Sequence, residues 1–89
     1  MKAIVTVVGK DRVGIIAGVC GILAEHSVNV LEISQTVMQG YFTMMMAVEM
    51  PEDAVPLGEL CQVMEEAGKK MEVSIRVQRE DIFDAMHRV

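Results

Sequence analysis

Apolar and polar residues change their spacing several times along the chain, and each spacing predicts an element. The first apolar run, residues 3–8, is short and rich in β-branched side chains, so it predicts a β-strand. After a loop that reads GKDRVG, apolar residues recur every three or four positions, which is the spacing of a helix packed on a sheet. The predicted apolar face of that helix comprises Ile15, Ile16, Val19, Ile22, Leu23 and, at its end, His26.

The next segment has a period of two. Residues 28–39 predict a second strand, in which one face is polar. Gln39 and Gly40 then form a tight turn into a third strand, residues 41–50, which must pair antiparallel with the second. The second strand alternates Leu31, Ile33 and Val37 with Glu32, Ser34 and Thr36, and the third strand places Phe42, Met44, Met46, Val48 and Met50 on a core face. The other face of the third strand is half apolar and flat enough to meet another sheet.

A second helix and a fourth strand complete the pattern. Residues 53–56 open the helix, and residues 73–78 alternate as a strand. The helix has an apolar stripe of Leu57, Leu60, Cys61, Met64, Ala67 or Gly68, and Met71. The order β-α-β-β-α-β predicts a ferredoxin-like α+β sandwich, in which a four-stranded antiparallel sheet carries two helices on one face.

The tail, residues 79–89, predicts a short C-terminal helix because acidic residues precede an apolar set. A helix this short is marginal alone, so we expect it to dock on its own domain or on a neighbour and to contribute to assembly. The whole chain of 89 residues is expected to be one domain, with a core over 1–78 and a tail over 79–89. Such a small core favours a homodimer or a higher homo-oligomer.

Composition narrows the possible partners and compartments. A net charge of −5 with three aromatic residues argues against nucleic-acid binding, which uses basic surfaces and stacking platforms. No leader-like segment and no apolar run near the roughly 18–20 residues of a membrane span is present, so we expect a cytoplasmic protein that does not enter membranes. Cys20 and Cys61 fall on apolar helical positions and are expected to be reduced.

The residue pattern gives little support for catalysis or metal binding. His26 and His87 lack neighbours at metal-ligand spacing, and consecutive Met44, Met45 and Met46 point to alternate faces of a strand. No nucleophile turn, dinucleotide fingerprint or phosphate loop occurs, so we expect no enzyme and no cofactor. A catalytic Asp11 assisted by His87 from a second copy is the remaining enzymatic alternative.

Glycines and one acidic residue in the first third of the chain have two interpretations. Gly18 and Gly21 lie inside the first helix, where they either allow a close backbone approach or pack poorly. Asp11 precedes the same helix and is placed to cap its first N–H groups. Gly14 lets a ligand approach the backbone, and the start of a helix suits a small carboxylate. The alternative is a simple start of a helix with no ligand.

The stretch GKDRVGIIAGVCGILAEHSVNVLEISQ resembles an ACT domain, whose pattern is D-R-x-G-[IL], a helix, and then N-[IV]. The resemblance covers nearly all of residues 1–78 and is similar to ACT units of glycine-cleavage repressors, formyltetrahydrofolate deformylase and nitrogen-sensing uridylyltransferases. The closing QREDIFDAMHRV is similar to the end of short, stand-alone prokaryotic ACT-domain proteins.

This resemblance implies a ferredoxin-like fold and a non-catalytic regulatory module that binds an amino acid or similar metabolite where two copies meet. Its ligand-binding positions correspond here to Asp11, Arg12, Val13, Gly14 and Ile15, with Asn29 and Val30 from the second strand. The pattern contains no attached catalytic or DNA-binding domain, so we expect output through oligomer state or a protein partner. The alternative function is a ligand-free adaptor or oligomerisation module.

Overall fold

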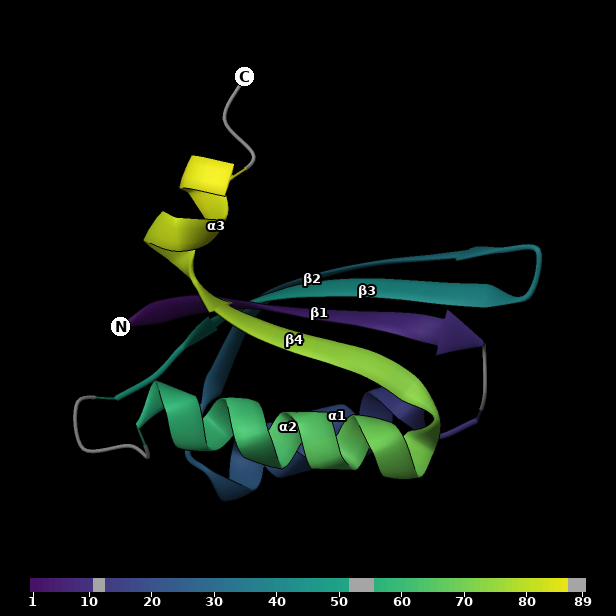
Figure 1. Ribbon diagram of the computed structural model, residues 1–89, viewed down its shortest axis with the longest axis horizontal. Helices are drawn as coiled ribbons and strands as arrows, with labels where there is room; N and C mark the ends of the chain where they lie inside the picture. The colour runs from purple at the N-terminus through teal and green to yellow at the C-terminus, as the bar shows by residue number, and fades with distance from the viewer. Residues whose placement is uncertain (11–12, 52–55, 87–89) are drawn as a thin grey trace.

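The computed structural model describes residues 1–10, 13–51 and 56–86, without the side chains of the last two. The element order is β1 (Lys2–Lys10), α1 (Ile15–Glu25), β2 (Asn29–Met38), β3 (Tyr41–Glu49), α2 (Leu57–Met71), β4 (Val73–Arg79) and α3 (Glu80–Met86). The strands form one sheet in the order β2-β3-β1-β4, and all neighbours are antiparallel. Both long helices cover one face of this sheet, whereas α3 stands on the other side (Figure 1). The predicted ferredoxin-like sandwich and its short C-terminal helix are therefore confirmed.

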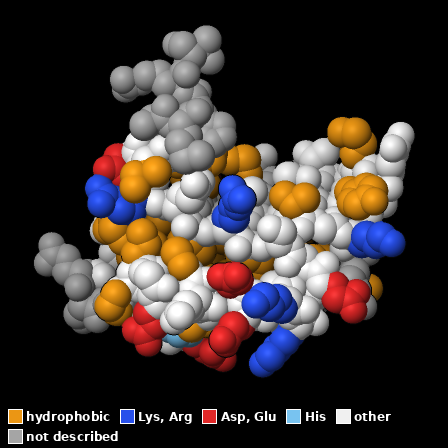
Figure 2. All heavy atoms as spheres, viewed as in Figure 1, with side chains coloured by type: hydrophobic (Ala, Val, Ile, Leu, Met, Phe, Trp, Pro, Cys, Tyr) orange, Lys and Arg blue, Asp and Glu red, His pale blue; other side chains and the backbone are white. Residues whose placement is uncertain are grey.

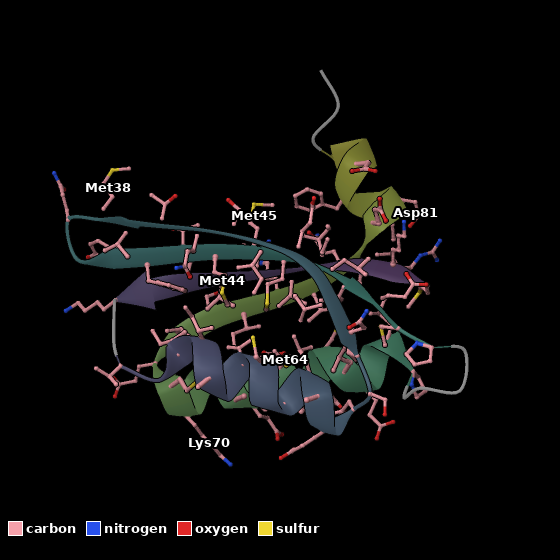
Figure 3. The ribbon with its side chains drawn as sticks, turned by 180° about the vertical axis from the view of Figure 1, so that it is seen from behind. Met38, Met44, Met45, Met64, Lys70 and Asp81 are labelled. Atoms are coloured by element: carbon pink, nitrogen blue, oxygen red, sulfur yellow. The ribbon has the colours of Figure 1, made fainter. Side chains whose placement is uncertain are left out.

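The core lies between the sheet and the two long helices. The predicted inward face of β3 is confirmed, because Phe42, Met44, Met46, Val48 and Met50 are all buried. The buried residues of α2 are Leu60, Met64 and Gly68. The sequence leaves open whether Ala67 or Gly68 belongs to the apolar stripe, and the structure shows that Gly68 does. In Figure 3 the side chains of Met44 and Met64 point into the space between sheet and helices, while that of Met45 points the other way.

One residue at the start of α1 differs from the prediction. Ile15, Val19 and Leu23 are buried as predicted, but Ile16 is 37% exposed and does not belong to the core face. The two helical glycines also differ from each other. A Cβ on Gly18 would lie 3.0 Å from the sulfur of Met71, whereas one on Gly21 would meet nothing within 4 Å. A close approach therefore explains Gly18 only.

The β2-β3 hairpin turns at Gln39 and Gly40, which both have positive φ, 52° and 80°. Two successive residues of this conformation give the tight turn that suits the right-handed twist of a hairpin. A bulge between Val30 and Glu32 takes Leu31 out of the predicted alternation. Beyond the bulge, the polar face of β2 pairs with the outward residues of β3, as expected, but every residue from Leu31 to Met38 is exposed. Of the two long helices, α1 contacts this edge strand but leaves its residues from Leu31 onward exposed.

The C-terminal helix docks on its own domain, where it contacts β1 and β4. Its first turn contains Glu80 and Asp81, which suit the positive end of a helix dipole. Ile82 is 47% exposed and Phe83 is half-buried. Docking on the parent domain was one of the two expected outcomes, and it leaves an apolar side chain of α3 in solvent.

Candidate functional site

The loop between β1 and α1 brings the first helical turn to the surface. The N-cap of α1 is Gly14, whose φ of 91° lies in the left-handed region that glycine tolerates best. Asp11 and Arg12 lie outside the described residues, so capping by Asp11 stays a prediction. The N–H of Gly18 donates to the carbonyl oxygen of Gly14 at 2.8 Å, and helix geometry gives the preceding N–H groups no partner inside the helix.

A pocket of about 240 Å³ lies beside this turn. Three of its lining residues, Val13, Gly14 and Ile15, are predicted ligand-binding positions, and the other two are Lys70 and Met71 from the end of α2. Val13 is fully exposed, whereas Ile15 is buried and anchors the turn on the core. The pocket therefore combines a buried anchor, Ile15, with the exposed residues Val13 and Gly14.

Sequence reasoning missed Lys70 and Met71. Lys70 has the pattern of a solvated outer face, and Met71 has the pattern of a core residue. The two helices run antiparallel beneath the sheet, so the last turn of α2 lies beside the first turn of α1 (Figure 1). Figure 3 shows Lys70 at the outer surface of the helix layer. No local sequence pattern indicates that Lys70 and Met71 lie beside the first turn of α1, because this proximity depends on how the two helices pack.

Asn29 and Val30 lie at the opposite end of α1 from Gly14. The 11 residues of α1 separate the two groups by about 16 Å along the helix axis. Asn29 pairs with Glu49 and is exposed, and Val30 pairs with Val48 and is half-buried. The described members of the predicted site therefore form two clusters, and one copy of the chain does not bring them together.

The strand that carries Asn29 has one unpaired edge. It is the first strand of the sheet order, so β3 covers only one side of it. Its exposed apolar residues are Leu31, Ile33, Val37 and Met38, with exposures from 47% to 68%. A long edge with exposed apolar side chains is a template for pairing with another chain. Proteins usually shield such edges, which makes this one a candidate interface.

A larger groove of about 510 Å³ follows the other sheet edge, between α2 and β4. In it the Cys61 thiol donates to the carbonyl oxygen of Val77 at 3.3 Å. Burial, followed by the negative charge of Glu65, raises the pKa of this thiol above its ordinary value. A protonated, hydrogen-bonded thiol is a poor nucleophile, so this groove has structural rather than catalytic character.

The described histidine caps a helix. The Nδ1 atom of His26 lies 2.8 Å from the carbonyl oxygen of Ile22, so the protonated ring nitrogen donates to the end of α1. His87 lies outside the described residues. Among the residues that the structure places, no group of three or more His, Cys, Asp and Glu side chains is arranged to hold a metal ion. None of the described helices is long and apolar enough to cross a membrane.

Comparison with known proteins gives one family. A sequence model of the ACT domain matches residues 2–78. A UPF0237 protein of Clostridium acetobutylicum is 54% identical over the full length of both chains. An ACT domain protein from Streptococcus pneumoniae has the same fold with a TM-score of 0.84 at 46% identity, and the alignment covers 98% of each chain. Both relatives are as short as this chain.

Two more distant structures share the fold only. A formyltetrahydrofolate deformylase from Pseudomonas putida has a TM-score of 0.76 at 18% identity, and the match covers 88% of this chain but 28% of the deformylase. A candidate glycine cleavage system transcriptional repressor has a TM-score of 0.69 at 18% identity, with 86% and 44% covered. In both proteins the matched unit is part of a longer chain.

Proposed function

Because the chain belongs to the ACT domain family, we propose that it is a non-catalytic regulatory module that binds an amino acid or similar small metabolite where two copies meet. In this proposal the ligand carboxylate lies against the first N–H groups of α1, in the pocket beside Gly14 and Lys70. The carboxylate of Asp11 meets the ammonium group. The free thiols of Cys20 and Cys61 fit a cytoplasmic location.

The observation that carries the proposal is the separation of Gly14 from Asn29 within one chain. The β2 edge runs antiparallel to α1, so Asn29 lies at one end of the sheet and the Gly14 pocket at the other. If two copies pair their β2 edges antiparallel about a two-fold axis, the start of one β2 lies beside the end of the other. Asn29 of each copy then approaches the Gly14 turn of its partner, and two composite sites form.

This arrangement also removes the exposed apolar edge. Pairing two β2 strands gives their unpaired backbone groups hydrogen-bond partners and covers side chains such as Ile33 and Val37. The helix layers of the two copies remain on the same side of a continuous sheet. Ligand binding across the interface then stabilises the dimer, which supplies an output without a second domain.

A first experiment measures thermal unfolding with each proteinogenic amino acid and with one-carbon and nucleotide metabolites. We expect one ligand class to raise the melting temperature by several degrees, because it binds only the folded dimer. Gly14→Leu is expected to remove the shift. Gly40→Leu is the control for backbone strain, because Gly40 also has a positive φ, of 80°, and does not line the pocket. A folded Gly14→Leu protein with an unchanged shift would contradict the proposal.

Mixing two variants tests whether the site is shared. Gly14→Leu and Asn29→Ala homodimers each lack one half of both sites. A heterodimer of the two variants contains one intact site, so mixing should restore binding to about a quarter of the wild-type sites, as statistical exchange predicts. Titration calorimetry of the equilibrated mixture measures this fraction. If no compound shifts the melting temperature of a stable oligomer, the adaptor alternative replaces this proposal.

A further inference from the structure

The sheet has one face that the long helices do not cover, which we call the open face. Its centre consists of three pairs from β1 and β3, which are Ile4 with Ala47, Thr6 with Met45, and Val8 with Thr43. Val8 is 43% and Met45 37% exposed, although Val7, Met44 and Met46 beside them are buried. Figure 3 shows Met38 and Met45 pointing away from the helix layer. The centre of the open face therefore presents apolar side chains and two threonines, all half-buried or exposed.

Charged side chains of opposite sign flank this apolar centre. Glu32 lies on edge strand β2, in the row of Ala47, Ile4 and Gln78. Arg76 lies on the opposite edge strand β4, in the neighbouring row of Thr6, Met45 and Ser34. Both charged side chains are exposed. The two charges thus lie on opposite margins of the open face and differ by a single row along the strands.

We propose that the open face binds the open face of a second copy, in a stack whose two-fold axis runs parallel to the strands. This symmetry places β2 of one copy over β4 of the other and keeps every row at the same height. Glu32 then lies one row, about 7 Å along the strand, from Arg76 of the partner subunit. Long acidic and basic side chains span that offset, so two ion pairs close the two margins.

The charges also exclude the other symmetric stack. A two-fold axis across the strands would place β4 over β4 and would bring Arg76 close to Arg76 of the partner subunit. Like charges at an interface oppose association, whereas unlike charges set its register. Both axes keep the strands of the two sheets aligned, which is the common geometry for stacked sheets, so the charges alone select between them.

The area of the open face matches the needs of a specific interface. Four strands about 4.8 Å apart present at most roughly 600 Å² on each copy, and α3 occupies one end of that face. The pair therefore buries at most about 1,200 Å², the size at which specific interfaces begin. A shallow depression of about 450 Å³ lies over Ile4, Ser34 and Met45, and side chains of the partner fit into it.

The C-terminal helix is compatible with this stack. It stands at one end of the open face and leaves the rest uncovered (Figure 1). Figure 1 shows the axis of α3 rising away from the sheet, and its 7 residues span about 10 Å, which is close to the spacing of stacked sheets. Its exposed Ile82 then gains a partner surface. In contrast, the charged side chains of α2 lie on the helix layer, far from the proposed contact (Figure 2).

This interface goes beyond the proposed ligand site, because it uses neither the Gly14 pocket nor the β2 edge. The two interfaces use different surfaces of the chain. Because the stack places β2 over β4 whereas edge pairing extends only the β2 side of a sheet, the two together give staggered layers rather than a closed tetramer. Sedimentation velocity over a concentration series measures the assembly of the wild type and of Glu32→Arg, Arg76→Glu and the double variant. Glu66→Arg, an exposed reversal on α2, is the matched control.

We expect each single reversal to weaken the stacking equilibrium at least about tenfold, and the double variant to restore it to within about threefold of wild type. Met45→Glu places a charge at the apolar centre and should abolish the stack while circular dichroism and the ligand-induced melting shift stay unchanged. The proposal is wrong if Met45→Glu leaves the assembly size unchanged, or if the double variant associates no better than the singles. Loss of the ligand shift alone would instead contradict the proposed function.

Discussion

Gly68 of α2 lies directly against the backbone of Val73 in β4. A Cβ at this position would come within 2.7 Å of the Val73 carbonyl oxygen and 3.3 Å of the Ile75 side chain. The contact fixes how closely the last turns of α2 approach the sheet. Because that approach also brings Lys70 and Met71 to the first turn of α1, this glycine supports the candidate ligand pocket as well as the core.

We expect Gly68→Ala to lower the free energy of unfolding by about 1–3 kcal/mol, because backbone atoms cannot move aside as a flexible side chain can. Gly21→Ala is the matched control, since its Cβ would meet nothing within 4 Å. That change should raise the free energy of unfolding by about 0.5–1 kcal/mol through helix propensity. Urea denaturation of both variants gives the two values, and equal effects would show that the close contact is absent in solution.

Met44 and Met45 are adjacent in β3 but face opposite sides of the sheet. Met44 is fully buried, so Met44→Ala should lower the free energy of unfolding by about 2–5 kcal/mol through lost burial and a cavity. Met45→Ala should change it by no more than about 0.5 kcal/mol when measured at a concentration where the chain does not self-associate. Chemical denaturation tests the pair, and a similar loss for both variants would contradict the described register.

At the junction between β4 and α3, the carboxyl group of Asp81 is expected to titrate at an unusually low pH. Arg79 donates to Asp81 through Nε at 3.1 Å and Nη2 at 2.6 Å, and the Ile82 N–H also donates to Asp81 at 3.0 Å. The hydrogen bonds from Arg79 are the largest cause that lowers the pKa of Asp81 below its ordinary value. A lowered pKa stabilises the fold above the unfolded-state pKa of about 3.9, and this stabilisation is lost as the pH falls through the folded-state value.

The amide resonance of Ile82 should therefore titrate with a midpoint below about 3.9. In Arg79→Ala the midpoint should rise toward that ordinary value, and in Asp81→Asn the titration should disappear. Nuclear magnetic resonance spectra recorded from neutral to acidic pH measure all three proteins. An unchanged midpoint in Arg79→Ala would mean that the ion pair does not form in solution.

The thiol of Cys61 should react slowly with iodoacetamide. Because burial and Glu65 raise its pKa, the alkylation rate of a Cys20→Ser variant should rise at a higher pH in the folded protein than in urea. Glu65→Gln should shift the folded profile to lower pH. The same linkage makes stability fall once the pH exceeds the unfolded-state pKa of the thiol. Coincident folded and unfolded profiles would contradict the described burial of Cys61.

The element order was predictable because alternation and helical spacing are local properties. The hairpin at Gln39 and Gly40 is an example, since the turn residues and the adjoining alternation agree. Exposure along β2 was not predictable in the same way. Ile33 and Val37 have the spacing of core residues, yet both are about half exposed because they lie on the edge strand of the sheet, where the long helices do not cover them. The bulge at Leu31 likewise leaves no clear local signal.

The residues of the candidate site likewise fall into those that the sequence identified and those that only the folded structure brings to the site. The residues of the Gly14 turn and Asn29 were identified from their resemblance to a family pattern, and that pattern lists positions without distances. Lys70 and Met71 were missed because they reach the pocket only through the packing of α2 against α1. The separation of Gly14 from Asn29, which motivates a composite site, also appears only in three dimensions.

The order and type of the elements, the inward face of β3 and the tight turn at Gly40 follow from the residue pattern alone, because each depends on side chains a few residues apart. The free sheet edge, the contact of Gly68 with Val73, and the position of Glu32 and Arg76 on opposite margins of one sheet face emerge only in the folded chain. These relationships join segments far apart in the chain. They are set by the joint packing of the sheet and helices, which no local pattern encodes.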